Sequence, residues 1–247
     1  MEDDEISRGA RSHARVVCIA VLIVIAVAAS IVAGAGRRVH HITVRRQLTS
    51  TRALDLAIRS ADVSISPVSV GPSTVEARES WTGGRPPSGV VVGIHRDVEL
   101  GSSCPSSQYF WPLGARCSVR YAVRVPGRTL GITMQTGDLT LSGIAGTLSA
   151  TLQTGDLRAS ALRATAVTVH VGVGDAHISF SGRPASVGVQ IGIGDASVLL
   201  PRGRYDIVAR ASVGDVRIGA GIVQDPTSAR RIVVRSNVGD VHLDADG

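Results

Sequence analysis

Hydrophobic and polar residues alternate one by one in short stretches along the second half of the chain. The triplet Val169-His170-Val171 is followed by similar triplets at 189–191 and 209–211. A period of two predicts a β-strand that buries one face and exposes the other. Hydrophobic residues make up 44% of the chain but aromatic residues only 3%, so the core must consist of Val, Ile, Leu and Ala. We therefore predict an all-β fold with many short strands.

A Gly-Asp pair recurs in register with this alternation. The pairs are Gly137-Asp138, Gly155-Asp156, Gly174-Asp175, Gly194-Asp195, Gly214-Asp215 and Gly239-Asp240. Successive pairs are 18, 19, 20, 20 and 25 residues apart, and the longest step contains the insertion GAGIVQDPTSARR. In every repeat the residues one and three positions after the Asp are aliphatic, and the residue between them is polar. A recurrence of this size indicates a repeat architecture.

Each repeat is expected to contain a strand, the Gly-Asp turn, a second strand and a second turn. About 19 residues of this kind form one coil of a single-stranded β-solenoid, in which stacked coils share a continuous aliphatic interior. We predict regular coils over residues 131–247. The less regular segment 54–130, in which Ala61-Asp62 takes the place of a Gly-Asp pair, is predicted to begin or cap the same solenoid.

The Gly-Asp pairs are interpreted as structural turns. Glycine reaches the positive φ values that a tight corner needs, and aspartate accepts hydrogen bonds from neighbouring backbone amides. The alternative is calcium binding by stacked carboxylates, as in nonapeptide β-rolls, whose binding unit recurs about every nine residues. Because the Asp residues are mostly 18–20 positions apart, we predict no metal and no cofactor.

An uncharged apolar run extends from residue 16 to residue 36. About 20 apolar residues span a bilayer, so the run predicts a transmembrane anchor. Residues 1–15 would then be a cytoplasmic tail, residues 37–53 a juxtamembrane linker, and the large C-terminal part extracytoplasmic. Arginines lie on both sides of the run and do not fix its orientation. A cleaved signal peptide is the alternative, because Ala33-Gly34-Ala35 resembles a cleavage site.

Cysteine usage supports an extracytoplasmic location. Cys18 lies in the apolar run, whereas Cys104 and Cys117 bracket the segment CPSSQYFWPLGARC. This spacing predicts a disulfide in an oxidising compartment, with two buried thiols as the alternative. The bracketed loop also carries three consecutive aromatic residues, Tyr109, Phe110 and Trp111. They are candidates for contact with a partner, or they plug the open end of the solenoid.

Charge and motif content narrow the classes of function. The net charge is +6 and every basic residue is arginine, which suits an anionic envelope polymer or lipid headgroup unless it reflects a biased coding composition. The arginines are scattered without interleaved aromatics, which argues against nucleic-acid binding. The sequence has no GxSxG, HExxH, CxxC or Walker motif, so we predict that the protein is not an enzyme. An envelope enzyme that uses the Asp row on glycans is the alternative.

The repeats resemble those of the bacterial "putative adhesin" family of β-strand-repeat proteins. The resemblance rests on SADVSI (60–65), VRVPGRTLGI (123–132), YDIVARASVGDV (205–216) and RRIVVRSNVGDV (230–241). It implies a β-solenoid exposed at the cell surface behind an anchor, and it offers no catalytic residues to carry over. We therefore expect a non-catalytic, membrane-anchored module with an adhesin, scaffold or envelope-sensing role, whose partner is an anionic envelope polymer or another surface protein. A glycan-acting enzyme and a calcium-stabilised binding module remain the alternatives.

Overall fold

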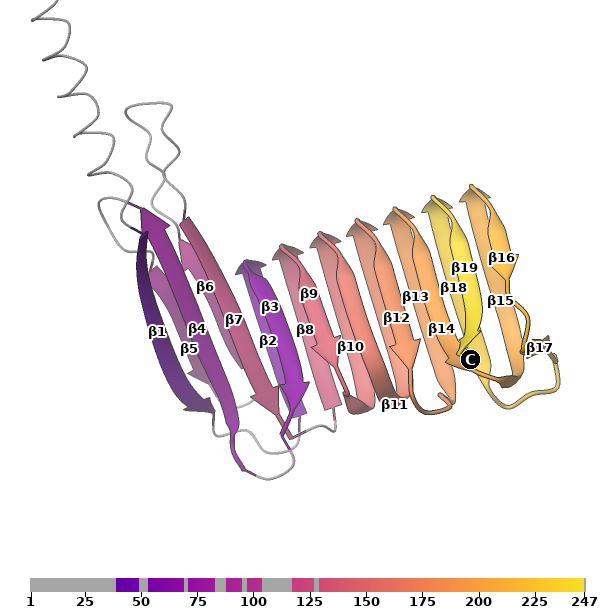
Figure 1. The fold of residues 1–247 in the computed structure, drawn as a ribbon, viewed down its shortest axis with the longest axis horizontal. Helices are drawn as coiled ribbons and strands as arrows, with labels where there is room; N and C mark the ends of the chain where they lie inside the picture. The colour runs from indigo at the N-terminus through magenta and orange to yellow at the C-terminus, as the bar shows by residue number, and fades with distance from the viewer. Residues whose placement is uncertain are drawn as a thin grey trace, which may run out of the picture.

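The computed structural model describes residues 39–48, 53–68, 71–82, 88–94, 97–103, 117–126 and 129–246, which form an all-β fold (Figure 1). These residues contain no helix. The strands are β1 (Val39–Leu48), β2 (Ala53–Ser60), β3 (Asp62–Pro67), β4 (Ser73–Thr82), β5 (Ser88–Ile94), β6 (Asp97–Ser103), β7 (Cys117–Val125), β8 (Thr129–Thr136), β9 (Leu139–Ser142), β10 (Ala145–Thr154), β11 (Leu157–Val173), β12 (Ala176–Phe180), β13 (Ser186–Ile193), β14 (Ala196–Pro201), β15 (Gly203–Val213), β16 (Val216–Ile218), β17 (Ile222–Gln224), β18 (Arg231–Val238) and β19 (Val241–Asp246). The all-β prediction is confirmed.

Most strands belong to two sheets, called sheet A and sheet B here, and the chain passes back and forth between them. Sheet A has the order β1-β4-β7-β3-β9-β11-β12-β14-β19-β16. Sheet B has the order β5-β6-β2-β8-β10-β11-β13-β18-β15. Pairing is parallel except for β1, β4 and β5 at the N-terminal end, which pair in antiparallel fashion. The long strand β11 contributes residues 157–160 to sheet A and residues 166–173 to sheet B.

The inward side chains of both sheets form one hydrophobic core. Leu139 and Leu141 of β9 lie in it together with Leu130, Ile132 and Met134 of β8, and each of these residues is almost fully buried. The residues between them point outward, as the alternation of polar and apolar positions requires. The core is therefore aliphatic, in agreement with the low aromatic content.

The Gly-Asp turns stack directly on one another. Gly155 N–H donates to Val173 O at 2.9 Å, and Leu157 N–H donates to Asp175 O at 2.8 Å, so each turn is bonded to the next. Gly174 has a φ of +135°, and a Cβ atom there would run into the carbonyl oxygen of Gly155. Glycine is required at this corner both for its backbone conformation and because the neighbouring turn approaches so closely.

The order of the repeats in space differs from their order in the sequence at both ends of the stack. β18 and β19, the last repeat of the chain, lie between β13–β14 and β15–β16. β2 and β3 likewise lie between β6–β7 and β8–β9. The insertion at 219–230 gives the chain enough length to pass the outer repeat and return inside it. The stack therefore departs from simple chain order at these two points.

The N-terminal strand β1 falls within residues 37–53, where the sequence predicted a linker. Residues 39–48 instead pair along their whole length with β4. Their alternating pattern, with Ile42 and Val44 between polar residues, suits an edge strand. The predicted anchor at 16–36 lies outside the described residues. Within the described residues, no helix is long and apolar enough to cross a membrane.

We expect Gly174→Ala to lower the free energy of unfolding by roughly 2–5 kcal/mol, because a strained backbone and a steric overlap act together. Gly188→Ala is the matched control in the neighbouring strand. There an added Cβ would meet Val167 O at an ordinary 4.0 Å and the backbone φ is not positive. The control should leave stability unchanged or slightly higher. Urea unfolding of both variants tests this, and equal losses would contradict the role assigned to the turn.

Candidate functional site

The Asp side chains of the stacked turns form one row along sheet A. Each carboxylate except that of the outermost Asp215 accepts a hydrogen bond from the backbone N–H of the Asp in the next turn. In spatial order the acceptor–donor pairs are Asp62–Asp138, Asp138–Asp156, Asp156–Asp175, Asp175–Asp195, Asp195–Asp240 and Asp240–Asp215, at 3.4, 3.1, 3.1, 2.8, 2.7 and 2.8 Å. Each of these six Asp side chains thus bonds to the neighbouring repeat and not to its own turn. Asp62, which follows Ala61 instead of glycine, begins the row.

Several basic side chains offset the repulsion between these carboxylates. Arg158 lies 3.2 Å from Asp156 at the closest N–O approach, and Arg120 lies 3.8 Å from Asp62. These pairs are largely exposed, so each contributes little to stability. Among the residues that the structure describes, no group of three or more His, Cys, Asp or Glu side chains is placed to hold a metal ion. The hydrogen bonds to backbone amides are therefore the principal interactions of the row.

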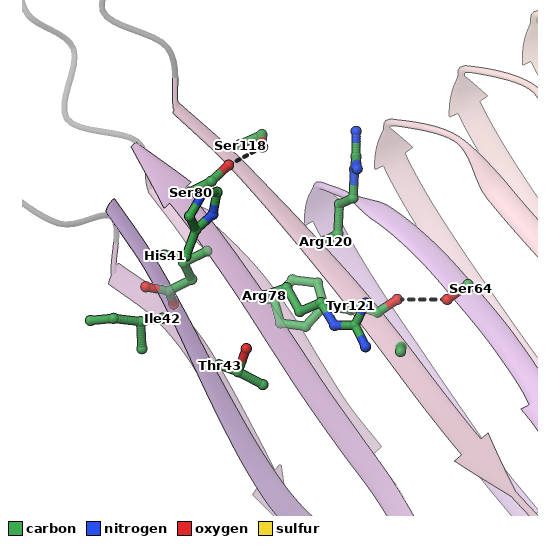
Figure 2. Close-up of a pocket in the computed structure, with 11 residues that line it drawn as sticks. His41, Ile42, Thr43, Ser64, Arg78, Ser80, Ser118, Arg120 and Tyr121 are labelled. Atoms are coloured by element: carbon green, nitrogen blue, oxygen red, sulfur yellow. Dashed lines mark hydrogen bonds between the residues drawn. The ribbon is translucent and has the colours of Figure 1, made fainter. Parts of the chain in front are cut away.

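A hollow of about 350 Å³ lies on sheet A where the antiparallel strands β1, β4 and β7 meet the parallel stack (Figure 2). Its outward side chains are mainly hydroxyls and bases, namely His41, Thr43, Ser64, Arg78, Ser80, Ser118 and Arg120, with Ala122 beside them. Glu79 also lines the hollow, and alternation along β4 places it on the core side with Ala77 and Trp81. Its lining is rich in hydrogen-bond donors.

Hydroxyl groups on neighbouring strands are held in fixed positions. The Ser80 and Ser118 hydroxyl oxygens lie 2.8 Å apart, and the Ser64 hydroxyl donates to Tyr121 O at 3.3 Å (Figure 2). A serine hydroxyl offers one donor and two acceptor positions, so one hydroxyl of the Ser80–Ser118 pair can still donate to a ligand, whereas Ser64 has only acceptor positions left. The two serine contacts bring β3, β4 and β7 together across the floor of the hollow.

Two arginines lie on the neighbouring strands β4 and β7, and their side chains extend in different directions (Figure 2). Arg78 and Arg120 are directly opposite residues in the antiparallel register. Like charges in this arrangement are unfavourable. Glu76 offsets part of this cost, because it accepts from Arg45 and Arg78 at 2.9 Å each, and these two hydrogen bonds lower the pKa of Glu76. Each of the two arginines therefore has a carboxylate neighbour, Glu76 for Arg78 and Asp62 for Arg120.

A second hollow of about 270 Å³ continues from the first toward the Asp row. It shares Ser64, Arg120 and Tyr121 with the first hollow and adds Asp138, Thr140 and Arg158 among its lining residues. Across the outer face of sheet A, basic residues give way to an acidic residue. Arg78 on β4 lies opposite Arg120 on β7, and Arg120 lies opposite Asp62 on β3. An anion is therefore attracted to the β4–β7 side of the surface and repelled from the turns.

Sequence reasoning did not identify this hollow. Arg78 and Arg120 lie far apart in the chain, and neither belongs to a motif. Their proximity depends on the antiparallel register of β4 and β7, which is set by tertiary pairing. The predicted contact residues Tyr109, Phe110 and Trp111 lie outside the described residues, as does Cys104. Cys117 begins β7, and the predicted Cys104–Cys117 disulfide stays a prediction.

The fold and the surface together define an all-β protein with a carboxylate row and an arginine-bearing hollow. No protein-family profile and no curated protein matches the chain. Among solved structures, a "putative cell adhesion protein" from Clostridium sporogenes is similar at 15% identity and a TM-score of 0.43, over 85% of this chain and 100% of that one. "Putative adhesins" from Bacteroides fragilis (11%, TM-score 0.34, 84% and 97% covered) and Parabacteroides distasonis (8%, 0.36, 83% and 98%) are also similar. Similarity at this level assigns neither a family nor a ligand to the chain.

Replacement of Asp175 tests whether the row acts through hydrogen bonding. Its carboxylate accepts from Asp195 N–H at 2.8 Å. Asp175→Ala should lower the free energy of unfolding by about 1–3 kcal/mol, because it leaves that amide without its acceptor. Asp175→Asn keeps an oxygen acceptor and should cost clearly less. Urea unfolding measures both variants, and an equal loss in the two would show that the charge matters and not the hydrogen bond.

Tyr121, beneath the hollow, should make the fold sensitive to alkali. Burial and then the charge of Glu79 raise the pKa of Tyr121 from 10.0 to about 12, and its hydroxyl donates to Gly101 O at 2.6 Å. Because the folded pKa lies above the unfolded one, the stabilisation is complete below pH 10 and is lost as the pH rises through about 12. The free energy of unfolding should therefore fall across this range.

Tyr121→Phe isolates this contribution. The variant should lose stability less steeply than wild type between pH 10 and pH 12 in urea titrations. Burial also raises the pKa of Tyr205, but that residue is present in both proteins and its effect cancels in the comparison. Identical slopes for wild type and variant would contradict the assignment.

Proposed function

We propose that this chain is a non-catalytic, membrane-anchored β-solenoid at the cell surface that binds an anionic envelope polymer and serves as an adhesin, scaffold or envelope sensor. The observation that carries the proposal is the opposed pair Arg78 and Arg120 in a hollow lined by hydroxyls. Each arginine has a carboxylate neighbour, Glu76 for Arg78 and Asp62 for Arg120, and an anionic ligand would add charge-assisted hydrogen bonds to the two guanidinium groups.

The strand pairing supports a β-solenoid. From β8 to β14, each strand pairs in parallel with the corresponding strand of the next repeat, while the chain alternates between the two sheets. Inward side chains of both sheets fill a single core. These are the properties of stacked coils that depend on their neighbours for burial. The antiparallel strands β1, β4 and β5 would then cap the N-terminal end.

The chemistry of the hollow favours phosphate or carboxylate groups carried on a polymer. Guanidinium groups bind such anions through paired N–H donors, and the serine and threonine hydroxyls supply further contacts. The first hollow extends across β1, β4, β7 and β3, and the carboxylates of the second hollow would keep the anionic groups of the chain on the β4–β7 side. Arg78 and Arg120 lie on one side of this surface and Asp62 lies on the other. This arrangement would attract the polymer to one side and repel it from the other, and so fix its position.

The proposed anchor brings the hollow close to the membrane. β1 begins at Val39, shortly after the apolar run that ends at residue 36. β1 also contributes His41 and Thr43 to the hollow. If the run is retained as an anchor, the site faces the innermost layer of the envelope, where anionic polymers and lipid headgroups are both within reach.

Binding to polyphosphate, a simple phosphate polymer, tests the proposal with the full chain in detergent. Arg78→Gln with Arg120→Gln should weaken binding at least tenfold, because charge-assisted hydrogen bonds are each worth about 1.5–3 kcal/mol. Arg163→Gln with Arg235→Gln is the control, with the same change of net charge at exposed arginines away from the hollow. Isothermal titration at fixed salt measures the affinities.

Three outcomes would overturn the proposal. Equal weakening in both double variants would mean that only the overall charge matters. Binding to phosphatidylglycerol vesicles without binding to polyphosphate would assign the site to a lipid headgroup. Recovery of the intact chain from the cytosolic fraction of cells would contradict the surface location.

A further inference from the structure

The end of the stack farthest from β1 has an open strand edge. β15 is the outermost strand of sheet B, and β18 pairs with it on the inner side (Figure 1). On the outer side of β15, the only described strand that pairs with it is β17, and this pairing covers only Gly203, Arg204 and Tyr205. Over residues 206–213 no described strand covers that edge. A long uncovered edge is a template for pairing with another strand.

The direction of the backbone groups along this edge follows from one hydrogen bond. Asp206 N–H donates to Arg230 O at 2.8 Å, so the polar backbone groups of Asp206 point inward toward β18. Backbone groups alternate in direction along a strand. The N–H and C=O groups of Ile207, Ala209 and Ala211 therefore point outward. They are donors and acceptors with no partner among the described residues.

The hydrophobic core also ends without a cover at this strand. Ile207, Ala209 and Ala211 pack against the core but are only partly buried. In the adjacent strand β18, the paired residues Ile232 and Val234 are both 0% exposed. The apolar interior thus continues up to a surface that water can reach, and a further layer would bury it.

Side chains at the end of the stack add apolar area. Val213 is 63% exposed and Val216 is 42% exposed. The residues that pair with them one layer inside are Val238, which is 45% exposed, and Val241, which is 0% exposed. Val216 is thus a core position that lacks its outer neighbour.

We infer that a second copy of the same chain covers this edge, through antiparallel pairing of β15 with β15 about Ala209. In this register Ile207 pairs with Ala211 of the other copy, and Ala209 pairs with itself. The three pairs exchange about six hydrogen bonds, because every outward group then meets its complement. A two-fold axis perpendicular to the sheet keeps both sheets and both cores continuous through the contact.

The charges on this strand suit pairing with itself. Asp206 and Arg210 lie on the same outward face of β15, two residues on either side of Val208. In the register centred on Ala209, Asp206 of one copy lies diagonally across from Arg210 of the other, twice over by symmetry. Diagonal pairs of opposite charge are favourable. β17 already occupies the edge at residues 203–205, so pairing in this register is confined to residues 206–212, and registers displaced toward β17 are disfavoured.

The oligomeric state of the full chain in detergent tests the inference by light scattering after size exclusion. Wild type at about 100 μM should be a dimer. Ala209→Pro removes one outward N–H without removing a bond to β18, and it should give a monomer. Val208→Glu with Arg210→Glu places like charges opposite each other and should also give a monomer. Arg235→Glu, in the same outward row one strand inside, is the control and should stay dimeric.

Hydrogen exchange separates this contact from association elsewhere in the chain. In the dimer the amides of Ile207, Ala209 and Ala211 should exchange at least tenfold more slowly than in the monomeric variants, and dilution of wild type should restore fast exchange. A monomeric wild type would overturn the inference. So would a dimer in which these amides exchange rapidly, or one that persists in both edge variants. Slow exchange in a monomer would overturn it too, because another segment would then cover the edge.

Discussion

The parallel layers from β8–β9 to β15–β16 depend on the contact between one Gly-Asp turn and the next. Between the turns at 155–156 and 174–175, two backbone bonds run in one direction, from Gly155 N–H and Leu157 N–H. A third runs in the opposite direction, from Asp175 N–H to the Asp156 carboxylate at 3.1 Å. The Asp156 carboxylate thus supplies the acceptor for the Asp175 amide, which the two backbone bonds leave without a partner. Glycine allows the turns to approach closely enough for all three bonds.

Because the turns are nearly equivalent, the contact does not specify which repeat must follow which. The turn at 239–240 bonds to 194–195 on one side and to 214–215 on the other, so it lies between two repeats that are consecutive in sequence. Such a rearrangement needs only enough intervening chain, which the insertion at 219–230 supplies. The last repeat thereby gains a neighbour on both sides, which protects the chain end from fraying. The outermost turn, Gly214-Asp215, keeps its unused bonding groups.

The same register that aligns the turns also positions the charges. Asp62 and its successors form an acidic row, and in sheet A this row continues into Arg120 and Arg78. The sign reverses between β3 and β7, one strand before the pairing becomes antiparallel. The repeats require an acceptor at each turn, whereas β7 and β4 do not belong to the row of Asp turns and are free to carry arginine. The surface chemistry of the hollow is thus a consequence of where the repeat pattern ends.

The sequence by itself determined the strand content, the positions of the Gly-Asp turns and the aliphatic core. Each of these follows from local pattern, since alternation defines a strand and glycine defines a tight corner. Even the degenerate turn at Ala61-Asp62 was visible in this way. Tertiary structure alone decided the order of the repeats at the two ends, the strand at 39–48, and the meeting of Arg78 with Arg120. These features depend on pairing between segments distant in the chain, and periodicity carries no information about which of several similar edges a strand will join.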